Sequence, residues 1–104
     1  MAGGIVMRLH RVRSEMVLAA CDEELLGTAL PVGKAGRTVT VSPQFYGERV
    51  VSAEELRWAL HRCTIANLLG ARVLAEAERE GVIGPGGHGT LGGVPHAEII
   101  TMLG

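Results

Sequence analysis

His96 is the side chain whose surroundings in this sequence best suit chemistry. Pro95 fixes the backbone immediately before it and biases Val94 toward an extended conformation, so the imidazole lies at a defined junction between a loop and a strand. An imidazole in a fixed position can act near neutral pH as a general base, a general acid or a ligand. The alternative is a histidine that only hydrogen-bonds to nearby backbone. His88 lies in the run "GPGGHGTLGG" before this junction, which we interpret as a mobile connecting loop.

Asn67 is a polar residue within the apolar stretch "CTIANLLGA". We interpret this stretch as part of a helix, where asparagine is a poor helix former and where a buried amide needs a hydrogen-bond partner. The amide therefore either holds a loop in place or contacts a ligand. Gly70 follows it, and because glycine has no Cβ, another backbone segment can approach closely there. The loop before His96 is the segment that we expect to occupy this notch.

The segment "CDEE", residues 21–24, groups carboxylates that could serve acid–base chemistry or bind a cation. The alternative is that they favour the start of a short helix, which Asp22 would cap. Cys21, Cys63, His96 and Asp22 are of the types that bind zinc, but their spacing carries no zinc signature. We expect no metal site and no cofactor, and we interpret both cysteines as buried, reduced thiols.

Arginines gather near the N-terminus, in the segment "MRLHRVR". Arg8, Arg11 and Arg13 could contact phosphate groups of a nucleic acid, and a charged strand end is the alternative. The formal net charge of −1 argues against binding of nucleic acid by overall attraction. The chain contains one Trp, one Tyr and one Phe, so its composition predicts no aromatic platform for stacking bases. The sequence shows neither a dinucleotide-binding or triphosphate-binding motif nor a nucleophile elbow.

The elements that position these residues belong to a chain long enough for one hydrophobic core, and we predict a single domain over residues 1–104. Alternation in residues 5–12 and a nearly continuous apolar run in residues 15–21 predict two strands in an antiparallel hairpin. One or two helical turns should follow Asp22 and end near Gly27. Further strands are predicted at residues 38–41, at 44–51 with a bulge at Gly47, and at 96–103.

A helix from Ala53 to Glu80 is the longest predicted element. Ser52 and Glu55 form a capping-box pattern at its start. A straight helix of this length would run about 40 Å, too long for a compact chain of this size, so we expect a bend or break near Gly70. Its middle is apolar on more than one face, which makes a homodimer a candidate. The predicted fold class is α+β, with a mixed or antiparallel sheet packed against one long, bent helix.

The segments "AACDEELLG", "FYG", "CTIANLLGA" and "GGVPHAE" occur in this order along most of the chain. In this combination the sequence resembles a family of small archaeal proteins known as domain of unknown function 424. The resemblance implies an archaeal, cytoplasmic protein that keeps company with translation components, so that RNA or the ribosome is its expected partner. It also implies that Asp22, Tyr46, Asn67 and His96 are motif residues of one shared locus. Glu98 stands where the family pattern has glutamine.

The leading interpretation is a small non-enzymatic binding module associated with RNA or the translation machinery. Its ligand-binding residues would be His96, Asn67, Asp22 and Tyr46, and the three arginines would contact phosphate. One alternative is a small hydrolase or transferase in which His96 is the general base and Asp22 orients it, so the sequence leaves open whether the protein is an enzyme. A second alternative is an obligate homodimer whose motif residues are purely structural. No signal peptide is evident and the apolar runs are too short to span a bilayer, so we expect a soluble, cytoplasmic protein.

Overall fold

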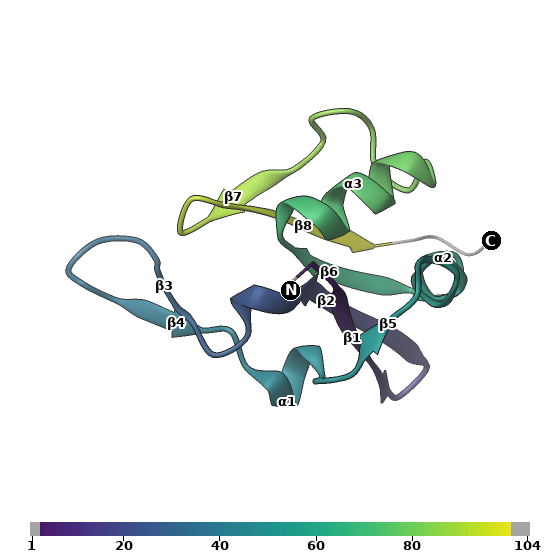
Figure 1. Cartoon of the computed structure of the whole chain (residues 1–104), viewed down its shortest axis with the longest axis horizontal. Helices are drawn as coiled ribbons and strands as arrows, with labels where there is room; N and C mark the ends of the chain where they lie inside the picture. Colours follow the sequence, from purple (N-terminus) through teal and green to yellow (C-terminus); the bar gives the residue numbers. More distant parts are fainter. Residues whose placement is uncertain (1–2, 101–104) are drawn as a thin grey trace.

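A six-stranded mixed sheet forms the centre of the protein in the computed structural model, which describes residues 3–100 (Figure 1). The strand order is β5-β1-β2-β6-β8-β7, with β2 and β6 parallel and the other neighbouring pairs antiparallel. A two-stranded antiparallel sheet of β3 and β4 lies beside it. The prediction of an α+β fold with a mixed sheet is confirmed. The strands are β1 Ile5–Val12, β2 Glu15–Asp22, β3 Ala29–Pro31, β4 Thr38–Thr40, β5 Val50–Val51, β6 Ile65–Leu69, β7 Gly89–Leu91 and β8 Val94–Ile100.

The strands β1 and β2 form the predicted hairpin. They pair over their full length, from Ile5 opposite Asp22 to Val12 opposite Glu15. Arg13 lies in the connecting turn with a φ of 57°, a left-handed conformation of the kind that short hairpin turns require. Because successive side chains of a strand point to opposite faces of the sheet, this register decides which residues of β1 can reach which covering element.

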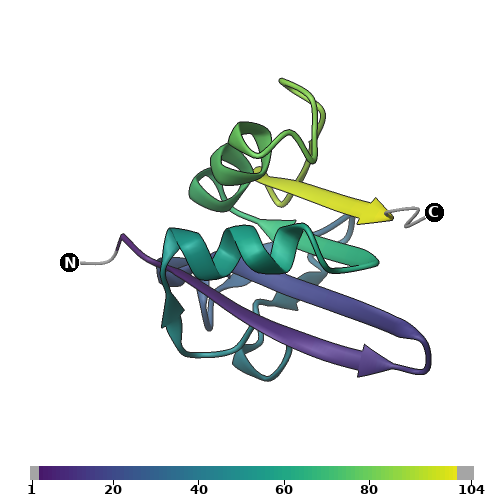
Figure 2. The same ribbon diagram turned by 90° about the vertical axis from the view of Figure 1, so that its right-hand side faces the viewer.

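Two helices cover one face of the sheet, which we call the helical face. They are α2 (Ala53–Leu60) and α3 (Ala71–Arg79). Figure 2 views the molecule from the side of α2, with α3 above it and the β1–β2 hairpin extending below. The apolar core of the helical face includes Leu18, Leu56, Leu60, Leu68 and Val73.

The opposite face of the sheet, which we call the hairpin face, is covered by the β3–β4 sheet and by the short helix α1 (Pro43–Tyr46). Figure 1 shows these elements on the side away from α2 and α3. The core on this face includes Val6, Cys21, Val41, Tyr46 and Leu69. The sheet therefore has a separate apolar core on each side.

The prediction of one long helix from Ala53 to Glu80 is wrong. α2 ends at Leu60, β6 crosses the middle of the sheet, and α3 begins after Gly70. A central strand that is buried on both faces has a nearly continuous apolar sequence, which periodicity alone does not distinguish from a buried helical segment. The apolar character on more than one side of "CTIANLLGA" reflects the two cores, so this stretch no longer supports a homodimer.

The stretch from residue 44 to 51 is also not the extended, bulged strand that we predicted. Ser42 caps α1, because its hydroxyl accepts a hydrogen bond from the N–H of Gln44 at 3.1 Å, and Pro43 occupies the first helical position. Gly47 ends the helix with a φ of 83°, and a Cβ there would lie 2.5 Å from the carbonyl oxygen of Met7. Only the last two residues of the stretch form a strand, β5.

Several boundaries agree with the sequence. A single 3-10 turn, η1 (Glu23–Leu25), follows Asp22, although the Asp22 side chain does not cap it. The capping box of Ser52 and Glu55 is present at the start of α2. The C-terminal strand is confirmed as β8 up to residue 100, and the rest of that prediction lies outside the described residues. The described part of the chain contains no helix long and apolar enough to cross a membrane.

Candidate functional site

Three of the four predicted ligand-binding residues meet on the hairpin face. The hydroxyl of Tyr46, at the end of α1, donates a hydrogen bond to Asn67 Oδ1 on β6 at 2.9 Å. His96 Nε2, on β8, lies 3.3 Å from the same oxygen. Because an amide oxygen can only accept, a hydrogen bond here requires the tautomer of His96 that carries its proton on Nε2. The predicted meeting of His96 and Asn67 therefore occurs, but between two strands rather than between a loop and a helix.

Strand register explains why these two side chains meet. Asn67 pairs with Glu98, and Leu69 pairs with His96, in the antiparallel ladder of β6 and β8. His96 and Asn67 are thus diagonal neighbours that point to the same face, within reach of each other's polar atoms. Pro95 contributes as well, because its carbonyl accepts a hydrogen bond from the N–H of Gly70 at 2.8 Å and ties the start of β8 to the end of β6.

A pocket of about 400 Å³ opens above this polar group. Its volume falls in the range typical of small-molecule sites. Residues of β4 line one side of it and residues of β7 and β8 line another, and Figure 1 shows where these strands lie. The two sides touch at Gly92, where a Cβ would lie 2.8 Å from the carbonyl oxygen of Pro31. The lining residues are Val39, Thr40, Val41, Ser42, Phe45, Tyr46, Asn67, Leu69, Leu91 and His96.

The lining contains no Asp, Glu, Lys or Arg side chain. Burial raises the pKa of Tyr46 to about 12, with a smaller contribution from Cys21, so the phenol stays protonated at neutral pH and remains a donor. Burial likewise raises the pKa of the Cys21 thiol to about 12, with smaller contributions from Asp22 and Glu24. A thiol with this pKa is a poor nucleophile. Because no charged side chain lines the pocket and Tyr46 is neutral, the pocket suits an uncharged ligand group.

The hydrogen-bonding capacity of Asn67 is only half used. Its oxygen takes the donors of Tyr46 and His96, but its amide nitrogen has no hydrogen-bond partner within residues 3–100. No buried side-chain nitrogen or oxygen of the described residues lacks a partner, so this amide nitrogen must reach the surface of the pocket. A largely apolar pocket therefore presents N–H donors of Asn67 that have no acceptor within the described residues.

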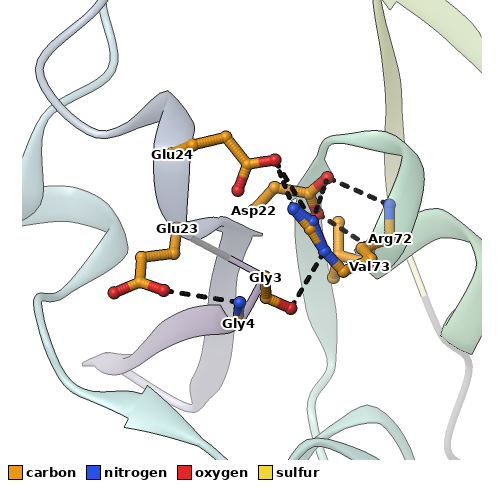
Figure 3. Close-up of polar contacts among 7 residues, drawn as sticks. All are labelled: Gly3, Gly4, Asp22, Glu23, Glu24, Arg72 and Val73. Atoms are coloured by element: carbon orange, nitrogen blue, oxygen red, sulfur yellow. Dashed lines mark hydrogen bonds and ion pairs between the residues drawn. The ribbon is translucent and has the colours of Figure 1, made fainter. Parts of the chain in front are cut away.

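Asp22, the fourth predicted residue, lies elsewhere (Figure 3). Its oxygens accept hydrogen bonds from the backbone N–H groups of Arg72 and Val73, both at 3.0 Å, so it caps α3 from a distant strand. The guanidinium of Arg72 lies 3.9 Å from Asp22 and also pairs with Glu24. Asp22 is thus committed to the helical side of the sheet and is not part of the pocket.

The contacts of Asp22 with the start of α3 also explain why position 70 is a glycine. The notch that we expected a loop to occupy is filled by the Asp22 carboxylate, whose oxygens would lie 2.6 and 2.7 Å from a Cβ at position 70. Gly70 also adopts a φ of 119°, which favours glycine. The glycine therefore makes room for the cap of α3.

The three arginines do not form one patch. Arg8 points to the hairpin face, where its Nη1 donates to the carbonyl of Gln44 on α1 at 2.9 Å. Arg11 points to the opposite face, because it is an odd number of residues away along β1. Arg13 is exposed in the hairpin turn. Arg8 is therefore the arginine of this set that lies beside the pocket.

An aromatic cluster at the mouth of the pocket was missed from the sequence. The His10 ring stacks on Phe45, with ring centroids 5.3 Å apart and an angle of 18° between the planes. Phe45 meets Tyr46 edge-on, with ring centroids 4.8 Å apart, and the residue as a whole is 36% exposed. A count of three aromatic residues hid the fact that two of them are adjacent and face one site. The signal was present in "SPQFYG", since a capped single turn presents both rings together.

The cysteines are free and buried, as predicted. Cys21 packs in the core of the hairpin face and Cys63 in that of the helical face. Among residues 3–100, no group of three His, Cys, Asp or Glu side chains is arranged to hold a metal ion. The zinc ligands considered from the sequence are thus divided between the two sides of the sheet.

Similarity to known proteins extends over nearly the whole chain. One solved structure, described as that of an uncharacterized conserved protein from Methanopyrus kandleri, aligns with a TM-score of 0.79 and 29% identity over 93% of this chain and 90% of that chain. No curated protein matches significantly. A family model described as "Protein of unknown function (DUF424)" matches residues 10–102, so the chain belongs to this family.

Proposed function

We propose that this member of the DUF424 family is a small non-enzymatic binding module whose site is the pocket on the hairpin face, and that its partner is RNA, free or within the translation machinery. The observation that carries the proposal is the unused amide nitrogen of Asn67 at the floor of an apolar pocket. Unpaired donors in a largely apolar pocket are the usual means by which a site orients a ligand.

The described residues give little support to catalysis. The Nε2–H of His96 donates a hydrogen bond to Asn67 Oδ1, and no carboxylate within residues 3–100 hydrogen-bonds to the His96 ring. Asp22, which the hydrolase or transferase alternative needs as the orienting group, is occupied by the N-terminus of α3. A histidine whose ring has no orienting carboxylate lacks one part of the arrangement on which acyl or phosphoryl transfer depends.

The obligate homodimer stays a separate prediction. Two exposed apolar residues, Leu9 (37% exposed) and Trp58 (50% exposed), line one shallow groove beside α2 on the helical side. Sedimentation equilibrium at micromolar concentration tests it, since a monomeric result would remove the alternative. The archaeal origin and the cytoplasmic location that the resemblance implies also stay predictions.

The RNA part of the proposal rests on Arg8 and on the aromatic cluster beside the pocket. Fluorescence anisotropy with a labelled single-stranded RNA measures the dissociation constant at several salt concentrations. We expect affinity to fall as salt rises, because phosphate contacts release counterions. Arg8→Ala should weaken binding and lower the salt slope by about 1, whereas Arg79→Ala on α3 should change neither.

Absence of RNA binding at low salt would refute the RNA part of the proposal. Equal effects of Arg8→Ala and Arg79→Ala would show that binding is general and not directed to the hairpin face. Arg11→Ala and Arg13→Ala, tested in the same way, decide whether the end of the β1–β2 hairpin also contacts phosphate. Co-sedimentation with ribosomes from the native host tests association with translation.

A further inference from the structure

The pocket and the aromatic cluster form one continuous surface. Phe45 lines the pocket, and the His10 ring stacks on it from β1. Arg8 donates a hydrogen bond to the carbonyl of Gln44, the residue before Phe45. A cationic group, a stacked ring pair and a pocket thus follow one another along the hairpin face.

The polar floor of the pocket offers a donor beside an acceptor. The unused N–H groups of Asn67 supply the donor. Tyr46 supplies the acceptor, because its oxygen keeps its lone pairs after donating its proton to Asn67 Oδ1 at 2.9 Å. The two sites are close together, since both surround the same amide group. A ligand that fits both sites has a hydrogen-bond acceptor next to a hydrogen-bond donor on one edge.

The remaining surroundings restrict the ligand further. Charged ligand groups find no ionic partner among the lining residues, so the group that enters should be neutral. Valine and leucine side chains form the walls, which favours a flat, weakly polar ring over a flexible polar chain. An unpaired nucleobase has a flat ring, no charge, and an acceptor beside a donor on its Watson–Crick edge.

We propose that the pocket binds one unpaired nucleobase through its Watson–Crick edge, with Asn67 and Tyr46 reading that edge, Phe45 offering a stacking face at the mouth, and Arg8 contacting the adjoining phosphate. This inference rests on the proposed function and adds the chemical class of the ligand. The base can come from a free nucleoside or nucleotide, or from a single-stranded RNA. Duplex RNA is excluded, because its Watson–Crick edges are already paired.

The composition of the chain makes this proposal easy to test by NMR. Asn67 is its only asparagine and Gln44 its only glutamine, so the side-chain amide region of a ¹H–¹⁵N spectrum reports on the pocket and its rim alone. The indole signal of Trp58, the only tryptophan, reports on the helical face in the same spectrum. Each titration therefore contains its own control for non-specific binding.

The probes are uridine, 3-methyluridine, ribose 5-phosphate, uridine monophosphate, and an oligouridine in single-stranded form or paired with its complement. We expect uridine to shift the Asn67 amide signals with a dissociation constant of about 1 mM. The methyl group blocks the donor of the edge, so 3-methyluridine should bind at least about 10-fold more weakly. Ribose 5-phosphate should leave Asn67 unchanged, and the single strand should bind tighter than the duplex.

Variants separate the role of each contact. Asn67→Ala and Phe45→Ala should each weaken uridine binding by about 10-fold, whereas Trp58→Ala, which removes an aromatic ring from the helical side, should leave it unchanged. Backbone amide spectra show whether each variant is folded. If Asn67→Ala does not fold, Tyr46→Phe replaces it, because that change removes one oxygen and keeps the ring.

The possible outcomes test recognition of a nucleobase separately from binding of RNA. Binding of single-stranded RNA with no response of Asn67 to any nucleoside at about 10 mM, or equal binding of uridine and 3-methyluridine, would overturn the inference and leave the RNA function standing. Binding of nucleosides without binding of RNA would support the inference and identify a free nucleoside or nucleotide as the source. Failure of both would refute the inference and the RNA function together.

Discussion

Replacing Asp22 by alanine should destabilise the protein and leave binding in the pocket intact. Asp22 is 5% exposed and accepts two hydrogen bonds of 3.0 Å from the first turn of α3. Without the carboxylate, the N–H groups of Arg72 and Val73 lose the acceptors shown in Figure 3, and Val73 is fully buried. Arg72 also loses one of its two carboxylate partners.

The expected loss can be estimated from these contacts. Removal of an N-cap acceptor costs about 1 kcal/mol, and a buried hydrogen bond to a charged group is worth about 1.5–3 kcal/mol. The two figures describe overlapping contributions, so we expect Asp22→Ala to lower the free energy of unfolding by about 3 kcal/mol. For a domain of this size that corresponds to a fall in Tm of about 15 °C. Asp22→Asn keeps one acceptor oxygen and should lose about half as much.

Urea unfolding, followed by circular dichroism and by the fluorescence of Trp58, measures these changes. Glu15→Ala is the matched control, because this exposed carboxylate at the start of β2 makes no side-chain hydrogen bond or ion pair within the described residues. Loss of less than about 0.5 kcal/mol in Asp22→Ala would refute the capping argument. A folded Asp22 variant with weakened ligand binding would instead return Asp22 to the binding site.

Four further results are expected. Absorbance titration at 295 nm, which sees Tyr46 alone because it is the only tyrosine, should give a midpoint near 12 in the folded protein and near 10 in urea. Burial raises the pKa values of Tyr46 and Cys21 in the folded protein above those in the unfolded chain. Ionisation of these two groups should therefore leave the free energy of unfolding unchanged below about pH 9 and lower it as pH rises toward 12. Urea unfolding measured at several pH values tests this expectation. Cys21 and Cys63 should not react with a thiol reagent at pH 8 until urea unfolds the chain. Gly70→Ala should lower the free energy of unfolding far more than Gly81→Ala, because both glycines have positive φ but only position 70 lacks space for a Cβ. Equal losses of this free energy in urea unfolding would show that the space around the Cβ does not matter.

Elements with a local signal could be predicted from the sequence. The β1–β2 hairpin follows from alternation, and the start of α2 follows from the capping box of Ser52 and Glu55. β6 could not be recognised, because a strand buried on both faces has no period of its own and its neighbours form helices on either side. The decision between one long helix and a helix–strand–helix unit depends on pairing with β2 and β8, which are distant in sequence.

The candidate site shows the same division. His96 was identified from Pro95, a local constraint, and Asn67 from a polar residue in an apolar stretch. Asp22 looked equivalent to them, but its role is decided by a helix about fifty residues later that needs a cap at its first turn. Phe45 was overlooked because its exposure depends on how α1 docks beside β1.

The ¹H–¹⁵N spectrum of the protein on addition of single-stranded RNA tests most directly whether the hairpin-face pocket is the binding site. The amide signals of Asn67 and Gln44 report from the pocket and its rim, and the indole signal of Trp58 reports from the helical side. We predict large changes at Asn67 and Gln44 with Trp58 unchanged. Changes confined to Trp58 and the residues of α2, with Asn67 unmoved, would contradict a binding site in this pocket.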